Sequence, residues 1–522
     1  MSSTTADYIV VGGGLAGCVI ASRLSQSEKK PSVILVEAGP DPSGKPNTDT
    51  ILNGLSLLGG ELDHAFQSAP VPTTANRQHF LPAGKVLGGG SILNFGGWLR
   101  ADVADYDAWG EAVGDRSWSY EGLKPWLDKV ESHLGAATIS SDPNRIYPLR
   151  NAVKTAWDEL GSQPAEEAKG SISGIVEVKE NTQNGLRQPS YAAYPLERVT
   201  VMTNTVVHRV NFSGKQATGI LLVDGREITA QKEVIITAGA YRTPQVLLLS
   251  GIGPPDVLSS HGIPVVQPSL GVGKNLFDHF AIYLAFRLRD PSKGYALGSS
   301  AFNNPSFFKG LPYDWAVSEQ LPAEKLDKVE SGGAFHNRNL YEVLVVYVPP
   351  GIPGIPVDGT HIATSTMLLL PTSRGTVTIK STDPNDQPEI QPNYLATELD
   401  REVIAHAARR TLDALLGTEA LKPIVEGETP PSGEGLEGLK PLTVDVSDSD
   451  LHERILKTGM QHHHSGGTAA MGSVVDVDGK VKGVERLRVA DGSVLPVPLG
   501  GHPQATLYAV AEKLADAILE QL

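Results

Sequence analysis

The chain has 522 residues, of which 40% are hydrophobic and 20% charged, and its net charge at neutral pH is −15. This length is enough for two or more folded units of roughly 100–200 residues each. The acidic balance argues against a nucleic-acid partner or an anionic membrane surface, because both require a basic protein surface. The 55 glycines and 37 prolines are spread along the chain, which indicates many loops rather than a disordered tail.

The first residues show no pattern of a signal peptide, and no stretch of the chain is long and apolar enough to span a membrane. We therefore expect a soluble, cytoplasmic protein. The chain has a single cysteine, Cys18, so no internal disulfide is possible. We interpret Cys18 as a small buried residue of the first helix.

Residues 7–37 predict a strand, a tight glycine turn, a helix and a second strand. Gly12, Gly14 and Gly17 have the G-x-G-x-x-G spacing. In this pattern the first glycine permits the sharp turn, the second lets the backbone approach a pyrophosphate, and the third lets helix and strand pack closely. Glu37 ends the second strand, where its carboxylate can accept hydrogen bonds from a ribose diol. The pattern predicts a dinucleotide site without distinguishing NAD from FAD.

A second glycine-rich stretch covers residues 84–94 and contains three consecutive glycines followed by Ser91. Backbone N–H groups in such a loop are free of side chains and can lie against a planar ring or a phosphate. Apolar residues on both sides, among them Val86 and Ile92, argue against a flexible surface loop.

Together, these two stretches resemble the glucose–methanol–choline (GMC) oxidoreductases. The family's first pattern is matched at Gly84, Leu87, Gly88, Gly89, Gly90, Ser91, Asn94, Trp98 and Ala101, and its second pattern at residues 239–253. The resemblance covers nearly the whole chain and implies that the dinucleotide is FAD. The cofactor contacts that it implies are Gly12, Gly14, Leu15, Ala16, Gly17, Glu37, Ala38, Val86, Gly89, Gly90, Asn94, Gly96, Val207, Asp491, Gly492, His502 and Pro503.

The fold class implied is α/β (α+β overall), with a Rossmann-like FAD-binding domain and a second, antiparallel-sheet substrate domain. We predict the main part of the FAD-binding domain at residues 1–280, with substrate-domain insertions around 50–75 and 120–195. The substrate-binding domain follows at 281–450. The C-terminal part of the FAD-binding domain, with the catalytic residues, covers 451–522.

Local patterns predict several further elements. Thr243 as N-cap and Pro244 as first helical residue predict a helix that ends at Gly251. The other predictions are helices at 120–134, 400–416 and 504–519, strands at 343–348, 366–370 and 376–380, and a surface loop at 422–445.

Three consecutive histidines occupy positions 462–464. A metal site is not favoured, because no third ligand with suitable spacing accompanies them. A run of solvated or buried histidines is an alternative reading of the residues alone. His64 is interpreted as a surface or structural histidine.

The family resemblance implies specific roles for several histidines. His464 stands where the family has its catalytic histidine, and His502 stands at a second position that members fill with His or Asn. An imidazole with a pKa of about 6.5 can accept the O–H proton of an alcohol at neutral pH. His502 would hydrogen-bond the alcohol oxygen, His463 would line the substrate pocket, and His279 would be structural. Because His502 precedes a helix, the dipole there also suits negative charge on a reduced flavin.

Two departures from the family are informative. Members with covalent flavin have a histidine at the position of Leu93, and a leucine cannot form that bond, so we expect FAD to be non-covalent. Many relatives have a larger residue at the position of Gly96, so we expect extra room for substrate there.

The sequence therefore predicts an FAD-dependent oxidoreductase that oxidises the CH–OH group of a small or aromatic primary alcohol, or of an intermediate of specialised metabolism. Hydride would pass to flavin N5, and oxygen or another acceptor would reoxidise the flavin. One alternative is a non-redox lyase or cyclase that keeps FAD as a scaffold, and another is a non-catalytic FAD-binding module. A photodecarboxylase is less favoured, because the pocket cysteine that it needs is absent and Cys18 lies in the cofactor helix.

Overall fold

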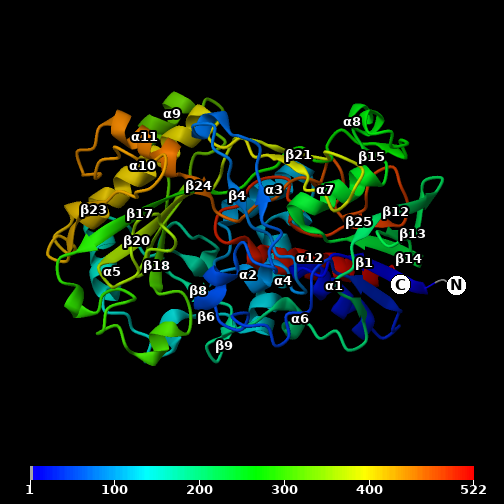
Figure 1. Ribbon diagram of the computed structural model, residues 1–522, viewed down its shortest axis with the longest axis horizontal. Coiled ribbons are helices and arrows are strands. Elements are labelled where there is room, and N and C mark those ends of the chain that lie inside the picture. Colours follow the sequence, from blue (N-terminus) through cyan, green and yellow to red (C-terminus); the bar gives the residue numbers. More distant parts are fainter. Residues whose placement is uncertain (1–3, 522) are drawn as a thin grey trace.

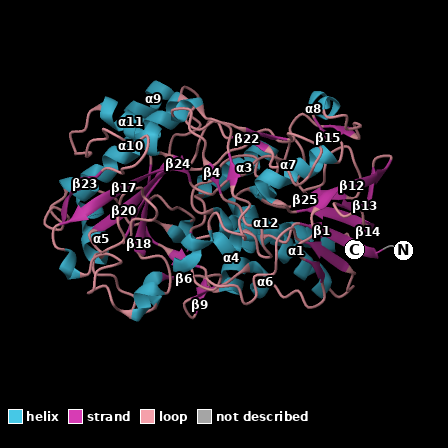
Figure 2. Cartoon of the chain, in the orientation of Figure 1, coloured by secondary structure: helices cyan, strands magenta, loops and turns pink. Residues whose placement is uncertain are grey.

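The computed structural model describes residues 4–521. Figure 1 shows an elongated molecule with one sheet at each end and helices between and around them. The sheet at the right contains the N-terminal strand, and the sheet at the left is built mainly from the middle of the chain. Figure 2 shows that long loops connect the two ends.

The first sheet is mainly parallel, as a dinucleotide-binding fold requires. Val10 pairs in parallel with Leu35 on one side and with Ile235 on the other, and all three side chains are buried. The strands in order are β11 (Thr200–Met202), β2 (Val33–Val36), β1 (Thr4–Val11), β14 (Glu227–Ile236), β13 (Gln216–Leu222) and β12 (Val207–Ser213), with β25 (Leu487–Val489) also paired to β14.

Three helices from distant parts of the chain pack together beside this sheet. Helix α1 (Leu15–Gln26) contacts α12 (Pro503–Leu519), and α12 contacts α4 (Tyr120–Leu134). Leu123, Leu127, Val130 and Leu134 recur at helical spacing on α4 and are all buried. The predicted helices at 120–134 and 504–519 are therefore confirmed, and the C-terminal segment returns to the first sheet.

The second sheet is antiparallel throughout, as predicted for the substrate domain. Helix α10 (Glu398–Leu412) packs on it and continues into a π turn at Asp413–Gly417. The strands in order are β23 (Val425–Thr429), β17 (Phe280–Leu288), β20 (His361–Leu368), β19 (Tyr341–Val346), β18 (Tyr313–Glu319) and β7 (Gly174–Glu177), with β24 (Met460–Gln461) also paired to β17.

Smaller elements complete the fold. The remaining helices are α2 (Gly90–Leu93), α3 (Val103–Val113), α5 (Arg150–Glu159), α6 (Ser190–Ala193), α7 (Gly239–Leu249), α8 (Pro255–Ser260), α9 (Ala323–Val329) and α11 (Asp448–Thr458). The short strands are β3 (Phe66–Gln67), β4 (Phe80–Leu81), β5 (Gly97–Trp98), β6 (Ala137–Thr138), β8 (Lys179–Glu180), β9 (Thr182–Gln183), β10 (Leu186–Arg187), β15 (Ile252–Gly253), β16 (Gln267–Pro268), β21 (Thr376–Thr378) and β22 (Glu389–Gln391).

The predicted start of α7 is wrong. The helix begins at Gly239, so Pro244 lies inside it and cannot donate a backbone hydrogen bond to Ala240. The hydroxyl of Thr468 donates to that carbonyl instead, at 2.6 Å. Thr243 is not a cap, because its hydroxyl donates to Asp491 Oδ2 at 2.6 Å. A distant residue thus permits a proline that local rules place at the helix start.

The prediction of a surface loop at 422–445 is also wrong in part. Residues Val425–Thr429 form β23 at the edge of the antiparallel sheet. Glu428 on this strand is buried and its carboxylate accepts a hydrogen bond from Arg454 Nη1 at 2.5 Å. The buried ion pair fixes a segment whose composition is typical of a loop.

The domain boundaries remain a prediction. Within the predicted insertion at 120–195, β7 joins the antiparallel sheet, whereas α4 packs beside the first sheet. Cys18 is fully buried in α1, as expected. Within residues 4–521, no helix has the length and apolar character needed to cross a membrane, and the cytoplasmic location remains a prediction.

Candidate active site

The first glycine turn is as tight as its sequence predicts. Gly12 has φ +105°, and a Cβ there would lie 2.5 Å from the carbonyl oxygen of Thr237. A Cβ on Gly17 would overlap the carbonyl oxygen of Gly12. Helix α1 then starts after Gly14 with no side-chain cap, so its first-turn N–H groups are available to an anion.

Glu37 lies directly beside this turn. Its carboxylate accepts hydrogen bonds from the N–H groups of Gly13, at 2.7 Å, and Gly39, at 2.8 Å. Burial raises the pKa of Glu37 to about 7, and the two backbone donors oppose that shift. The side chain is thereby held at the end of β2, at the position predicted for the ribose.

The second glycine loop packs against the first turn. The N–H of Gly88 donates to the carbonyl of Gly13 at 2.7 Å, and a Cβ on Gly89 would lie 2.7 Å from the Cα of Gly14. The loop leads into α2 and then to Asn94, whose side chain accepts from Arg187 Nη1 at 2.7 Å and donates to Gln504 at 3.2 Å. Two glycine-rich segments thus form one continuous wall.

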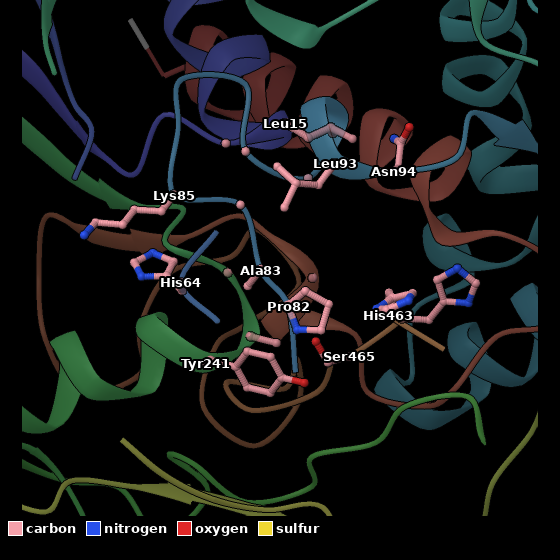
Figure 3. Close-up of a pocket in the computed structure, with 18 of the residues that line it drawn as sticks. Leu15, His64, Pro82, Ala83, Lys85, Leu93, Asn94, Tyr241, His463 and Ser465 are labelled. Carbon is pink, nitrogen blue, oxygen red and sulfur yellow. The ribbon is translucent and has the colours of Figure 1, made fainter. Parts of the chain in front are cut away.

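One cavity of about 820 Å³ runs along this wall to the histidine run, within the size range of small-molecule sites. Figure 3 shows Leu15, Leu93 and Asn94 on one side of the cavity, and Tyr241 and Ser465 on the opposite side. The predicted site residues that line it are Gly12, Gly14, Leu15, Ala16, Glu37, Ala38, Gly89, Gly90, Asn94, Gly96, Val207, His463, His464, Asp491, Gly492, His502 and Pro503.

Two predicted cofactor contacts do not line the cavity. Gly17 lies beneath the turn, against Gly12. Val86 is fully buried in a small apolar cluster with Leu57, Leu62 and Ile92. Both residues pack behind the wall and do not form its surface. The cavity lining therefore does not support the prediction that they contact the cofactor directly.

Asp491 lines the cavity, and its contact with the cofactor stays a prediction. Its carboxylate accepts from the N–H groups of Gly239 and Ser493, both at 2.8 Å, and from Thr243, so it also positions the start of α7. The expectation of extra room at Gly96 is wrong. A Cβ on Gly96, which has φ +77°, would overlap Ile51, so the missing side chain leaves no extra room for substrate.

His464 is held from both its backbone and its ring. Its N–H donates to Asp278 Oδ1 at 2.7 Å, and its Nδ1 lies 2.9 Å from Nδ1 of His279. His279 is fixed in turn, because its Nε2 lies 2.9 Å from the carbonyl oxygen of Leu499. Burial, reinforced by neighbouring histidines, holds the pKa of His464 well below its usual value, and burial lowers that of His279 to about 4.

This chain of contacts fixes the protons. A carbonyl oxygen only accepts, so His279 carries its proton on Nε2 and, as a neutral ring, presents a lone pair on Nδ1. His464 must then carry its proton on Nδ1, which leaves the lone pair of its Nε2 as the basic atom. The ring is therefore prepared to accept a proton.

His502 stands beside His464, with ring centroids 5.6 Å apart. It is the N-cap residue of α12, its N–H donates to Leu99 at 3.0 Å, and its Nε2 lies 3.0 Å from Oε1 of Glu342. A Cβ on Gly97 would come within 2.6 Å of His502 Nδ1 and 3.2 Å of the hydroxyl of Tyr313. A glycine at position 97 therefore keeps Nδ1 accessible.

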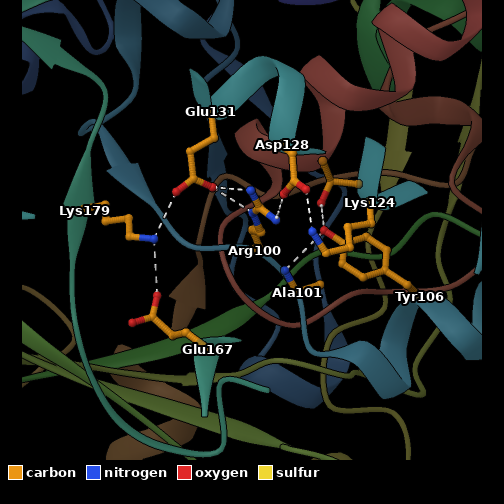
Figure 4. Close-up of polar contacts among 9 residues, drawn as sticks. Arg100, Ala101, Tyr106, Lys124, Asp128, Glu131, Glu167 and Lys179 are labelled. Atoms are coloured by element: carbon orange, nitrogen blue, oxygen red, sulfur yellow. Dashed lines mark hydrogen bonds and ion pairs between the residues drawn. The ribbon is translucent and has the colours of Figure 1, made fainter. Parts of the chain in front are cut away.

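Polar contacts hold the residues that follow Leu99, the residue whose carbonyl accepts the His502 N–H (Figure 4). Arg100 donates to Glu131 at 2.7 Å and to Asp128 at 2.8 Å. The N–H of Ala101 donates to the hydroxyl of Tyr106 at 3.3 Å, and that hydroxyl lies 2.7 Å from Thr506 on α12. The contacts of Tyr106 tie the segment that receives the His502 N–H to the helix that His502 begins, and those of Arg100 tie it to α4.

Comparison with known proteins identifies the family. Two sequence models described as GMC oxidoreductase match residues 6–281 and 371–511. The chain belongs to the GMC oxidoreductase family. The GMC-type oxidoreductase acuG of Aspergillus aculeatus is 42% identical over 99% of this chain and 100% of its own. Patulin synthase of Penicillium expansum is 30% identical over 98% of this chain and 91% of its own.

Solved structures agree with this assignment. A formate oxidase has a TM-score of 0.88 and 26% identity, over 100% of this chain and 99% of its own. A fungal aryl-alcohol oxidase has a TM-score of 0.78 and 26% identity, over 99% of both chains. GMC oxidoreductases bind FAD, and the predicted Rossmann-like α/β fold is confirmed. Structures of Aspergillus oryzae formate oxidase variants address modification of its FAD.

Within this GMC oxidoreductase, the three consecutive histidines make different contacts. His462 Nδ1 lies 2.8 Å from the hydroxyl of Tyr283, whereas the His463 ring faces Phe95 with centroids 6.1 Å apart. Among residues 4–521, no group of three or more His, Cys, Asp and Glu side chains could hold a metal ion.

Sequence reasoning missed several residues of the site. Glu342 shows a signal, because it is a lone acid within an apolar strand, but its partner His502 lies 160 positions away. His279 is structural as predicted, yet it also positions His464. His64 lines the cavity and stacks on Phe66 at 4.9 Å, and burial lowers its pKa to about 3.

Proposed function

We propose that this flavin oxidoreductase oxidises the CH–OH group of a small alcohol to a carbonyl. The observation that carries the proposal is the placement of His464 and His502, with ring centroids 5.6 Å apart, on the wall of the same cavity as the two glycine turns. When bound, FAD supplies an acceptor for the hydride that leaves the alcohol carbon.

We assign the general base to Nε2 of His464. The hydrogen bonds from Leu499 through His279 favour a lone pair on this atom, and burial keeps the ring neutral and able to accept the O–H proton. The base then becomes an imidazolium whose Nδ1–H still donates to His279.

We assign to His502 the stabilisation of negative charge on the alcohol oxygen. Its Nε2–H donates to Glu342, so a second N–H on Nδ1, beside Gly97, requires the imidazolium form. A buried carboxylate 3.0 Å away interacts favourably with that positive charge. The pair therefore supplies a charged donor where the alkoxide develops.

The cavity fits FAD in ways that this chain itself shows. The uncapped start of α1 suits a pyrophosphate, and the buried carboxylate of Glu37 suits a ribose diol. We propose that the FAD is non-covalent, because Leu93 lines the cavity at the position of the family's attachment histidine and has no nucleophilic atom.

The test is anaerobic mixing of the purified flavoprotein with a panel of primary alcohols. The flavin absorbance should bleach and the corresponding aldehyde should form, and admission of air then distinguishes oxygen from another acceptor. His464→Gln should slow bleaching by at least about 100-fold, since a positioned base contributes about 10²–10⁴-fold. His452→Gln, a change at an exposed residue of α11, should have no effect.

Unbleached flavin during turnover of a substrate would instead favour the lyase or cyclase alternative. Equal bleaching rates in the wild type and His464→Gln would contradict the assignment of the general base to His464.

A further inference from the structure

The two ends of the cavity differ in charge. Among the described residues that line it, the charged ones are Glu37, Lys85, Arg242 and Asp491. Glu37 and Lys85 flank the glycine turns, and Arg242 and Asp491 lie on or against α7, all at the dinucleotide end. The end with the histidine run therefore offers no Asp, Glu, Lys or Arg side chain to a substrate. A quaternary ammonium would lose its hydration there without a carboxylate to compensate it.

The antiparallel sheet forms the opposite wall of this uncharged end. Leu344 of β19 pairs with Ser365 of β20, which pairs with Tyr283 of β17, so the three side chains form a row on one face. Val346 and Tyr313 pair in the next row, and all five residues line the cavity. Aromatic rings and branched aliphatic chains are suited to a flat, apolar molecule.

His463 enters this end with a strained backbone. Its φ is +62°, a left-handed conformation that residues with a side chain adopt at a cost. Gln461 holds it there by accepting the N–H of His463 at 2.6 Å while donating to the carbonyl of Phe80 at 2.9 Å. A glycine or asparagine would satisfy the same turn at lower cost, so the backbone alone does not account for a histidine.

The imidazole of His463 also has unused hydrogen-bonding capacity. Its Nδ1 is buried without a hydrogen-bond partner among residues 4–521, and its ring faces the edge of Phe95. Burial lowers the pKa of His463 to about 4, so the ring is neutral and has one donor and one acceptor. A buried polar side chain without a partner beside a substrate cavity indicates that a ligand group completes it.

We propose that His463 determines specificity by hydrogen-bonding a second polar group of the substrate, which is an uncharged aromatic primary alcohol with a hydroxyl on its ring. The proposal rests on the proposed function and names its substrate class. The ring of the substrate lies against the aromatic and aliphatic side chains of the sheet wall, and its CH₂OH group reaches His464 and His502.

The experiment compares the three hydroxybenzyl alcohols with the three methylbenzyl alcohols of nearly equal size. The readouts are the rate of anaerobic flavin reduction and, separately, the dissociation constant of each matching aldehyde from the change in flavin absorbance. For at least one hydroxy compound, the rate constant of flavin reduction divided by Kd should be tenfold or more above that of its methyl counterpart. The affinity for the matching aldehyde should be higher by the same factor. A hydrogen bond in a buried site commonly has an effect of this size. Choline should not reduce the flavin.

His463→Phe should abolish this preference, and His463→Asn, which tolerates the left-handed backbone, should reduce it. The matched control His452→Phe should leave it intact. If the wild type oxidises alcohols with no hydroxy preference, or if His463→Phe keeps the preference, the inference is wrong while the proposed function stands. If no alcohol bleaches the flavin, the proposed function fails, and the inference fails with it.

Discussion

Removal of the negative charge behind His502 is the sharpest test of the proposed chemistry. Glu342 on β19 is fully buried, and Oε1 of its carboxylate lies 3.0 Å from His502 Nε2. Glu342→Gln keeps the length of the side chain and a hydrogen bond to the imidazole but removes the charge. We expect the His502 ring to stay in place and to lose its contact with a negatively charged partner.

The size of the effect follows from the hydrogen bond that changes. A hydrogen bond to a charged group contributes about 1.5–3 kcal/mol, and a neutral one about 0.5–1.5 kcal/mol. The difference of about 1–1.5 kcal/mol corresponds to a loss of about 5–15-fold in rate. Glu342→Leu also leaves a buried N–H without an acceptor, and we expect a loss on the order of 100-fold.

The assay is the limiting rate of anaerobic flavin reduction at saturating alcohol, with KM and bound FAD measured in parallel. The limiting rate should fall while KM and FAD content change little, because Glu342 acts through His502 and contacts neither ligand. Glu426→Gln, at an exposed residue on β23 at the edge of the same sheet, is the matched control. A limiting rate for Glu342→Gln within twofold of the wild type would refute the role given to this carboxylate.

Three further predictions concern the cofactor and acid stability. Gly17→Ala should purify with little FAD by its absorbance ratio, because the new methyl group would overlap the carbonyl of Gly12; normal FAD content would contradict the tight-turn argument. Acid denaturation of the wild type should release FAD quantitatively into a protein-free filtrate, since Leu93 cannot bond to it; yellow precipitated protein would argue for a covalent link. The pKa of His279 is about 4 in the folded protein and ordinarily 6.5. As the pH falls, His279 is therefore protonated in the unfolded chain before it is protonated in the folded protein, which lowers the free energy of unfolding. His279 should account for about 2 kcal/mol of the folding free energy lost between pH 7 and pH 5. The denaturation midpoint of the His279→Gln variant should therefore fall less over this range than that of the wild type. Equal falls would contradict this assignment.

The cofactor half of the site is predictable because its geometry is local. Gly12, Gly14 and Gly17 lie within six residues, and the contacts that require glycine there involve the adjacent strand ends. The half that we propose to be catalytic is different. His464 and His502 were located by family resemblance, and the residues that fix their protons, His279 and Glu342, come from segments whose strand pairing is not visible in the sequence.

The errors have the same origin. Local rules place Pro244 at a helix start, but a hydroxyl 228 positions from Ala240 satisfies the carbonyl that the proline leaves free. Family comparison suggests space at Gly96, but Ile51 fills the direction of its missing side chain. In each case one long-range contact overrides a sound local expectation, and such contacts require the fold.

Strand β19 links the catalytic role that we propose for His502 to the substrate specificity that we propose for this site. Alternate residues of a strand share a face, so Glu342, Leu344 and Val346 point the same way. Glu342 supports His502, while Leu344 and Val346 line the cavity where we place the substrate ring. A substitution that moves this strand to admit a larger ring would also move the carboxylate away from His502. The glycine turns lie on the other sheet, so such a change would lower the rate of flavin reduction without a matching loss of FAD.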